Sequence, residues 1–443
     1  MGAALVVLAL HLAVNVSAED ACAAGEACSS SLSFDTPCRD VLEVLPPGTP
    51  KLWSRTRPAV ISGAVADAAW DLRAFSFEAM KVDFGETLLK VFSPAQAALL
   101  DGQTSRVLPL RRIISKLDDE QKIYVFDKEF FQNVSAKELA PIPGWLKMSD
   151  AVAFLTLGGP LSGTQFHAHG TAFLLLVAGK KRWYLHEPGQ FPNASARALH
   201  LPVSAFEKDV LPSLESAPLG CVQHAGDAIL VPDGWAHATI NVEETLGVAW
   251  QRTTSLIKTC EHGHDYWCLG QSFVSAEKLS LKKQPQRYKE LFAEANELTG
   301  DFPIGFIRHL GPYWQVSTEA KDIFKAVRSK VLQLLKASKR HSDEALLAAA
   351  LVKRLADVLM GTRKDAKRAS DLLAVAQKKA PEAGQGLALA RLLGQQFRWK
   401  EAAEALAVHA SYFPEDRGAA LMLEQATNFA RKAQMEQSAA PPR

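Results

Sequence analysis

The spacing of apolar residues changes along this chain, and that change limits what it can fold into. Between about Val44 and Arg252, short apolar runs are separated by Gly, Pro and Asn, as at 59–62, 123–126, 151–155, 172–177, 228–231 and 246–250. Runs of this length that end at turn residues are typical of strands. After about Gln271, Ala, Leu, Lys and Glu dominate with helical spacing. We therefore expect an α+β chain, with a sandwich or barrel of strands followed by an all-α region.

Composition narrows the classes of function. The chain has 443 residues, 48% of them hydrophobic, with 50 Lys and Arg against 48 Asp and Glu, a net charge of +2. This is ordinary globular composition, and the length predicts two to three domains. A net charge this small gives no general attraction for nucleic acid. After the first residues, no apolar run approaches the ~18–20 residues that a membrane span needs.

The first residues have the pattern of a targeting segment. An apolar stretch from Ala3 to Val14 is followed by small residues at 16–18, which suits cleavage before Glu19. We predict a signal peptide over 1–18, the alternatives being an uncleaved anchor or a chance apolar start. We expect the chain in the endoplasmic reticulum lumen or secreted.

Cysteine usage agrees with an oxidising compartment. Three cysteines lie in a Cys-rich segment at 19–42, and up to three disulfides can form, with the pairing left open. The six are Cys22, Cys28, Cys38, Cys221, Cys260 and Cys268. The triplets at Asn133 and Asn193 are glycosylation acceptors if the chain is secreted.

The carboxyl-terminal part contains a repeat. Ala369 lies 12 residues before Pro381 (381 − 369), and Ala402 lies 12 residues before Pro414 (414 − 402). The two pairs are 33 residues apart (414 − 381), close to the 34-residue period of tetratricopeptide helix pairs. We predict a linker over 256–284, a tetratricopeptide-like helical domain over 285–435 and a disordered tail over 436–443. A generic stack of helical hairpins is the alternative. Either could hold another protein or pack against a second copy.

Two blocks of sequence carry histidines suited to metal binding. In the first, His167 and His169 are two residues apart, so both point to one face if they lie in a strand. In the second, Pro232 ends an apolar run and His237 follows Trp235, 70 residues after His167 (237 − 167). A third imidazole can thus join the first two, and three imidazoles can hold a metal.

Lys181 lies between the two blocks. It has the parity of Val177, Gly179, Trp183 and Leu185, so an inward-pointing Lys181 would sit among apolar neighbours. A buried ammonium needs an anionic partner to stay charged.

Together these motifs resemble the JmjC (jumonji C) family, and most closely its secretory-pathway lineage. The resemblance covers 43–255 and implies a double-stranded β-helix, a jelly-roll of cupin type. It implies that His167, His169 and His237 hold Fe(II), and that Lys181 and Thr164 bind the distal carboxylate of 2-oxoglutarate. No further catalytic residue is implied.

The chain departs from the family pattern at His169, where the family has a carboxylate. Three imidazoles with an open position also suit zinc, so the metal is iron or zinc. Asp227 and Glu187 are nearby carboxylates that could substitute, although Asp227 lies in a turn and suits a cap. Strand alternation places Thr164 on the face opposite His167 unless Gly163 marks a bulge.

We therefore expect an Fe(II)- and 2-oxoglutarate-dependent protein oxygenase of hydroxylase type, in the secretory pathway, acting on a protein substrate. The alternative is a catalytically inactive binding or adaptor protein of the endoplasmic reticulum lumen. It would keep the β core and act through its helical repeats.

Overall fold

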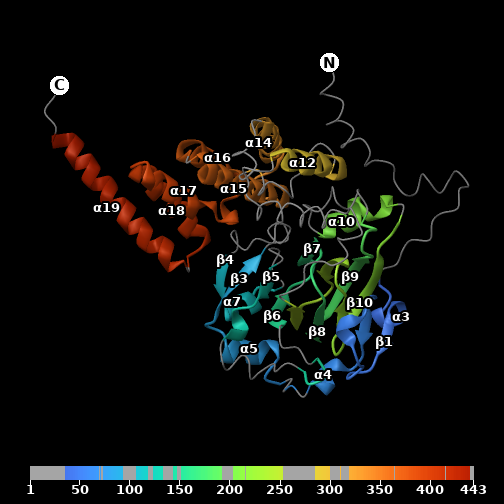
Figure 1. Cartoon of the computed structure of the whole chain (residues 1–443). Coiled ribbons are helices and arrows are strands. Elements are labelled where there is room, and N and C mark those ends of the chain that lie inside the picture. Colours follow the sequence, from blue (N-terminus) through green and yellow to red (C-terminus); the bar gives the residue numbers. More distant parts are fainter. Residues whose placement is uncertain are drawn as a thin grey trace, which may run out of the picture.

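The computed structural model describes residues 35–68, 70, 73–92, 106–117, 123–132, 143–146, 151–191, 203–214, 216–252, 285–299, 310, 319–363, 365–414 and 416–439. The predicted signal peptide, the predicted linker, both glycosylation triplets and Cys22, Cys28, Cys260 and Cys268 lie outside these residues. The expected order of a β region and then an all-α region is confirmed (Figure 1).

The strands form two sheets. The larger has nine strands, in the order β1 (Glu43–Leu45), β2 (Ala59–Ile61), β11 (Ala228–Val231), β8 (Ala172–Ala178), β13 (Thr245–Arg252), β6 (Ala151–Gly158), β5 (Tyr124–Asp127), β3 (Leu88–Phe92) and β4 (Arg106–Pro109). The smaller has four, in the order β10 (Leu219–His224), β9 (Lys180–His186), β12 (Ala236–Asn241) and β7 (Gly163–His167). Neighbours are antiparallel except β1 and β2.

The two sheets face each other across a buried layer. Trp183 and Leu185 of the smaller sheet join Leu174, Ile229 and other residues of the larger sheet in one apolar cluster. A second cluster covers the outer face of the larger sheet, where Met80 and Ile113 pack against it from short helices. The described helices of the β region are α3 (Cys38–Val41), α4 (Ala64–Asp67), α5 (Phe77–Asp83), α7 (Leu110–Ile114) and α10 (Val203–Asp209).

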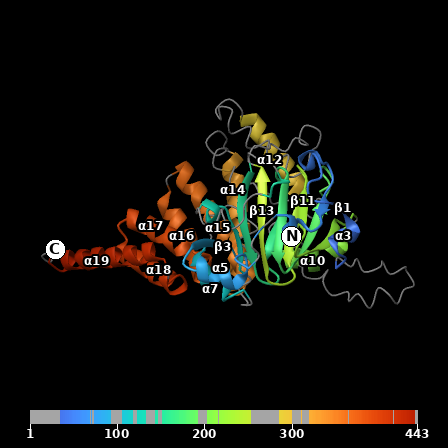
Figure 2. The same ribbon diagram turned by 90° about the horizontal axis from the view of Figure 1, so that it is seen from below.

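Helix α10 covers the outer face of the smaller sheet through Phe206 and Val203. Because side chains alternate along a strand, residues of the smaller sheet that do not pack beneath α10 point between the sheets. Figure 2 shows β13 and β11 in the larger sheet, where β8 lies between them. The inner layer is therefore the place where a buried site can form.

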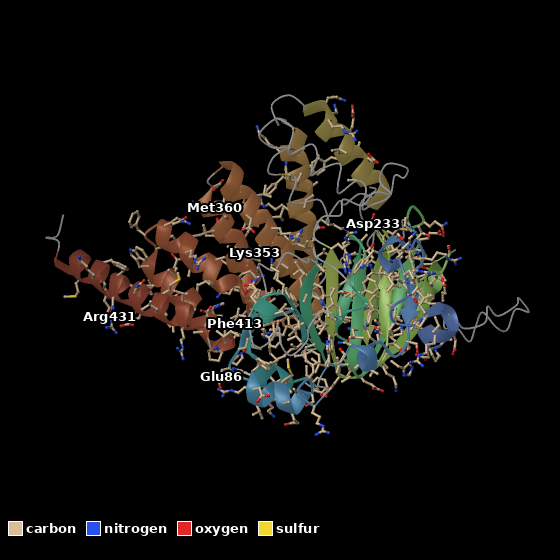
Figure 3. The ribbon with its side chains drawn as sticks, turned by 60° about the horizontal axis from the view of Figure 1, so that its bottom comes forward. Glu86, Asp233, Lys353, Met360, Phe413 and Arg431 are labelled. Atoms are coloured by element: carbon tan, nitrogen blue, oxygen red, sulfur yellow. A yellow bond between two sulfur atoms is a disulfide. The ribbon has the colours of Figure 1, made fainter. Side chains whose placement is uncertain are left out.

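Within the residues that the structure describes, seven long helices follow the sheets. They are α12 (Pro285–Thr299), α14 (Glu319–Ala337), α15 (Asp343–Arg363), α16 (Ala366–Lys379), α17 (Gln385–Gln395), α18 (Trp399–Tyr412) and α19 (Arg417–Ala439). From α14 onward each packs on the next around one apolar core. Figure 3 marks this stack by Lys353, Met360, Phe413 and Arg431, and marks the β11–β12 turn by Asp233. Helix α19 continues past residue 435, where we expected a disordered tail to begin.

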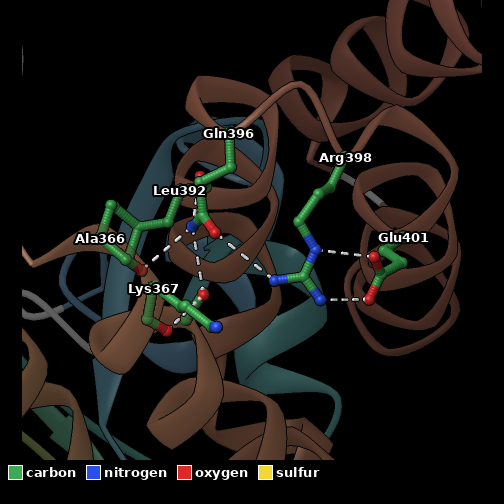
Figure 4. A network of polar contacts seen from close by, with 7 residues as sticks. Ala366, Lys367, Leu392, Gln396, Arg398 and Glu401 are labelled. Carbon is green, nitrogen blue, oxygen red and sulfur yellow. Dashed lines mark hydrogen bonds and ion pairs between the residues drawn. The ribbon is translucent and has the colours of Figure 1, made fainter.

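A polar network fixes the turn between α17 and α18 (Figure 4). The Gln396 amide donates to the carbonyl oxygens of Ala366 and Leu392, both at 3.0 Å. Arg398 donates to Glu401 through two nitrogens, at 2.7 and 2.5 Å. Three helices are thus joined by a few side chains. Within the described part of the chain, no helix combines the length and apolar composition of a membrane span.

Candidate metal centre

Three histidines meet on the inner face of the smaller sheet. His167 ends β7 and pairs with His237 on β12, with ring centroids 4.2 Å apart. His169 lies beyond the end of β7, so our placement of both residues in one strand was wrong. The turn after the strand still brings its ring to 5.1 Å from His167 and 4.8 Å from His237.

The backbone orients all three rings in the same way. Each Nδ1 lies within hydrogen-bond distance of a backbone carbonyl oxygen, which can only accept. Each Nδ1 therefore carries the proton, and each Nε2 keeps a free lone pair, the form in which imidazole binds a metal. The acceptors for His167, His169 and His237 are Gln165, Gly170 and Trp235, at 2.8, 2.7 and 2.9 Å.

Burial keeps these rings neutral. It lowers the pKa of His169 to about 3, with the nearby His167 lowering it further. Burial likewise lowers the pKa of His167, and it holds that of His237 well below the ordinary 6.5. At neutral pH the site is three uncharged nitrogen donors.

This donor set fits a divalent metal. One ligand atom from each histidine lies within 4.8 Å of the others. Nitrogens bound at 2.0–2.1 Å to one ion are at most about 4.2 Å apart, so small side-chain rotations would complete coordination. No carboxylate among the described residues joins the group.

Neither proposed substitute for the missing carboxylate is present in the cluster. The buried Asp227 accepts two hydrogen bonds from Arg39, at 2.7 and 2.6 Å, and a third from the Gly63 amide at 3.3 Å. Its role is to hold the segment before β1 against the β10–β11 turn. Glu187 is exposed at the end of β9 and is not in the group.

Lys181 is fully buried, at 0% exposure, on the same inner face. Its ammonium donates to the Asn241 side-chain oxygen and lies 5.2 Å from the centre of the Tyr124 ring. Burial lowers its pKa to about 7. We expected an anionic partner, and the described residues supply only neutral ones. A buried cation of this kind fits an anionic ligand.

The lysine and the histidines lie along one strand. On β12, His237, Thr239 and Asn241 alternate onto one face, and Asn241 pairs with Lys181 on β9. His237 and Asn241, the residue paired with Lys181, are therefore four residues apart on one surface.

Thr164 reaches this face through a bulge. His167 pairs with His237 and Thr164 pairs with Thr239, so β7 uses three residues where β12 uses two. The bulge lies between Thr164 and His167 rather than at Gly163. It sets the Thr164 hydroxyl 3.0 Å from that of Thr239, with both side chains buried.

Four further residues on the inner surface were not among the sequence candidates: Asn241, Ser162, Tyr124 and Thr156. Asn241 has the strand parity of His237, a signal that could have identified it. Its amide donates to Ser162 at 3.0 Å. Tyr124 comes from the opposite sheet, which no local pattern indicates. Thr156, also in the larger sheet, is 1% exposed, and its hydroxyl has no hydrogen-bond partner among the described residues. A buried hydroxyl without a hydrogen-bond partner and a buried ammonium whose partners are all neutral fit a site for a small carboxylate.

Comparison with known proteins agrees with this geometry. No family model matches the chain. It is 32% identical over 132 residues to JmjC domain-containing protein 8 of Homo sapiens, covering 29% of this chain and 48% of that protein. For the Mus musculus protein the identity is 26% over 179 residues, covering 40% and 59%. For 2-oxoglutarate and iron-dependent oxygenase JMJD4 of Danio rerio it is 33% over 109 residues, covering 22% and 26%.

The chain thus spans about half the length of the JmjC domain-containing protein 8 relatives that it matches. The names of these relatives agree in kind with one another. The chain is therefore a homologue of JmjC-domain proteins.

Proposed function

We propose that this protein is an Fe(II)- and 2-oxoglutarate-dependent protein oxygenase of hydroxylase type, with a three-histidine metal site in a double-stranded β-helix. One observation carries the proposal. Three neutral imidazoles with free Nε2 atoms lie on the inner face of the smaller sheet. The buried Lys181, which has no acidic partner among the described residues, lies on the same face. The relative named a 2-oxoglutarate and iron-dependent oxygenase supports the choice of cofactors.

In this proposal each residue of the site has a separate role. His167, His169 and His237 hold the metal, and their fixed Nδ1 protons keep the rings aimed at it. Lys181 neutralises the distal carboxylate of 2-oxoglutarate, and Thr164 donates a hydrogen bond to it. When bound, iron and 2-oxoglutarate supply the oxidising chemistry.

The test is conversion of 2-oxoglutarate to succinate by the full chain with Fe(II) and ascorbate. We expect His237→Ala to abolish turnover. His409→Ala is the matched control, because His409 is also buried, at 5% exposure, but lies in the helical stack. No turnover by the wild type over a range of candidate protein substrates would contradict the proposal.

The alternative is an inactive JmjC-fold adaptor, favoured by His169 in place of the carboxylate. Three neutral imidazoles leave an iron site one negative charge short and match the donor set of zinc. Zinc in the purified protein, bound tightly and with no decarboxylation, would select this alternative.

We further propose that the helices form a tetratricopeptide-like stack that binds a protein partner. Helices α16 and α18 begin 33 residues apart (399 − 366), and Ala369 and Ala402 are buried at equivalent places in them. Deleting residues 365–443 is expected to remove partner binding and to spare Co(II) binding by the histidines.

We also propose that the protein resides in the secretory pathway. The disulfide between Cys38 and Cys221 joins residues 183 apart and supports an oxidising compartment. The expected result is a glycosylated chain that starts at Glu19, checked by mass spectrometry before and after glycosidase treatment. Recovery of an unprocessed, reduced chain would contradict this location.

A further inference from the structure

The segment before β1 is tied to the smaller sheet at several points. We call residues 35–42 the strap. Cys38 forms a disulfide with Cys221 on β10. The Val222 amide donates to the Thr36 carbonyl oxygen at 2.8 Å, and Asp35 forms an ion pair with Arg182. The strap thereby covers the edge strand β10, which would otherwise present unpaired backbone groups.

The strap also holds the turn between β10 and β11. Arg39 binds both carboxylate oxygens of Asp227, which is 2% exposed. Cys38 and Cys221 are equally buried, at 2% and 0%. A bidentate ion pair from the half-exposed Arg39 to the buried Asp227, together with a buried disulfide, fixes β10 more firmly than contacts between two exposed side chains would.

Gln223 connects the Asp227 turn to residues between the two sheets. It lies on β10, two residues after Cys221, and is 1% exposed. Its amide nitrogen donates to the carbonyl oxygens of Asp227 at 2.8 Å and of Leu174 at 2.9 Å. Its side-chain oxygen accepts from the Trp183 indole at 2.9 Å. One amide thus joins the strapped turn, the opposite sheet and the indole.

Trp183 reaches the metal centre. Its ring lies 6.0 Å from that of His237, with an angle of 30° between the planes. Trp183 pairs with Cys221 on one side and with Thr239 on the other, so it bridges the strapped edge and the strand that carries His237. A continuous series of contacts therefore runs from the strap to His237, one of the three clustered histidines.

We propose that Gln223 and the strap are positioning elements for His237, acting through Trp183, and that the Cys38–Cys221 disulfide makes metal affinity depend on thiol redox state. The inference rests on the proposed metal site. Reduction by a dithiol would break the sulfur–sulfur bond and give two cysteine thiols, while the dithiol becomes a disulfide. The released strap would then hold the Asp227 turn, Gln223 and Trp183 less firmly.

The test is titration of the full chain with Co(II), whose visible bands report the number and geometry of its ligands. We compare the wild type, C38A/C221A, Q223M and the combined variant. Loss of groups that orient a ligand typically weakens metal binding 10–100-fold. We expect about tenfold weaker binding for C38A/C221A and for Q223M, with altered Co(II) bands. The combined variant should be no weaker than Q223M, since both changes act on one path.

Q377M is the matched control. Gln377 is also a buried glutamine whose amide donates to a backbone oxygen, Ala405 at 2.8 Å, but it lies in the helical stack. It should leave affinity and bands unchanged. If C38A/C221A does not fold, wild-type protein reduced by a dithiol takes its place in the titration, and Q223M decides the role of Gln223.

Wild-type affinity and bands in folded Q223M would overturn the inference while leaving the proposed function intact. Additive losses in the combined variant would equally overturn a path through Gln223. Failure of the wild type to bind Co(II) would refute the metal site itself, and this inference with it.

Discussion

Replacing Lys181 by methionine tests whether a buried ammonium lacks an anion in the free protein. Methionine has similar length and no charge, so it fits the same space. In the folded protein burial lowers the pKa of Lys181 from 10.5 to about 7. At about 1.4 kcal/mol per pH unit, this difference amounts to about 5 kcal/mol of lost stability in the limit of low pH.

The sign of the pH dependence follows from proton binding. Below pH 7 the lysine is charged in both states and the full penalty acts; above 10.5 it is neutral in both and the penalty is gone. Between these values the unfolded chain binds more protons, so the stability of the wild type rises with pH. We expect K181M to remove about 4 kcal/mol of this penalty at pH 7 and about 2 kcal/mol at pH 9.

Urea unfolding measures the difference. Tryptophan fluorescence is a suitable probe because Trp183, Trp235 and Trp250 are buried in the β region. K181M also leaves the Asn241 oxygen without its donor, a loss of about 1–3 kcal/mol that does not vary with pH. The diagnostic quantity is therefore the slope with pH. Lys180→Met is the control, since the Lys180 side chain is 41% exposed beside Glu243.

An anionic ligand should reverse the penalty. Addition of 2-oxoglutarate should stabilise the wild type more at pH 7 than at pH 9.5, and should not stabilise K181M. Parallel stability curves for wild type and K181M between pH 7 and 10 would refute the reasoning, because they would mean that Lys181 titrates normally.

Three further predictions address the metal centre. Because the pKa of His169 is about 3 and those of its partners are also lowered, Co(II) affinity should stay nearly constant from pH 7 to 5. A tenfold fall per pH unit near 6.5 would show that the rings titrate normally. His169→Asp should restore the family's carboxylate and raise succinate formation with Fe(II), whereas unchanged turnover would mean that this position does not limit the chemistry. A Cβ at Gly158 would collide with the Asn241 amide and the Ser162 hydroxyl, so Gly158→Ala should raise the KM for 2-oxoglutarate at least several-fold and leave Co(II) affinity unchanged. Equal loss of both would contradict separate metal and carboxylate sites.

Local sequence was sufficient for the elements and for much of the site. Alternation and turn residues identified strands, and the 33-residue period anticipated the spacing of α16 and α18. The same parity argument placed Lys181 inward, and the structure has it fully buried. These predictions hold because each uses the period of a strand, two residues, or of a helix, 3.6 residues. Both periods are set by the local backbone geometry.

Local periodicity failed where the backbone leaves its regular form. His169 lies beyond the end of β7, and the bulge between Thr164 and His167 reverses the expected face of the threonine. Both features depend on pairing with β12, some 70 residues away in sequence (237 − 167). A bulge changes which face a residue occupies without changing the hydrophobic pattern that predicts the strand.

The sequence alone determined that three histidines and one inward lysine would be available in a β core, because residue type and strand parity are local properties. Only the tertiary structure decided that the lysine has no acidic partner among the described residues, that Asp227 binds Arg39, and that Tyr124 of the other sheet lies beside Lys181. Those facts depend on which distant segments come together, and that choice is made by packing of the whole chain rather than by any one stretch of it.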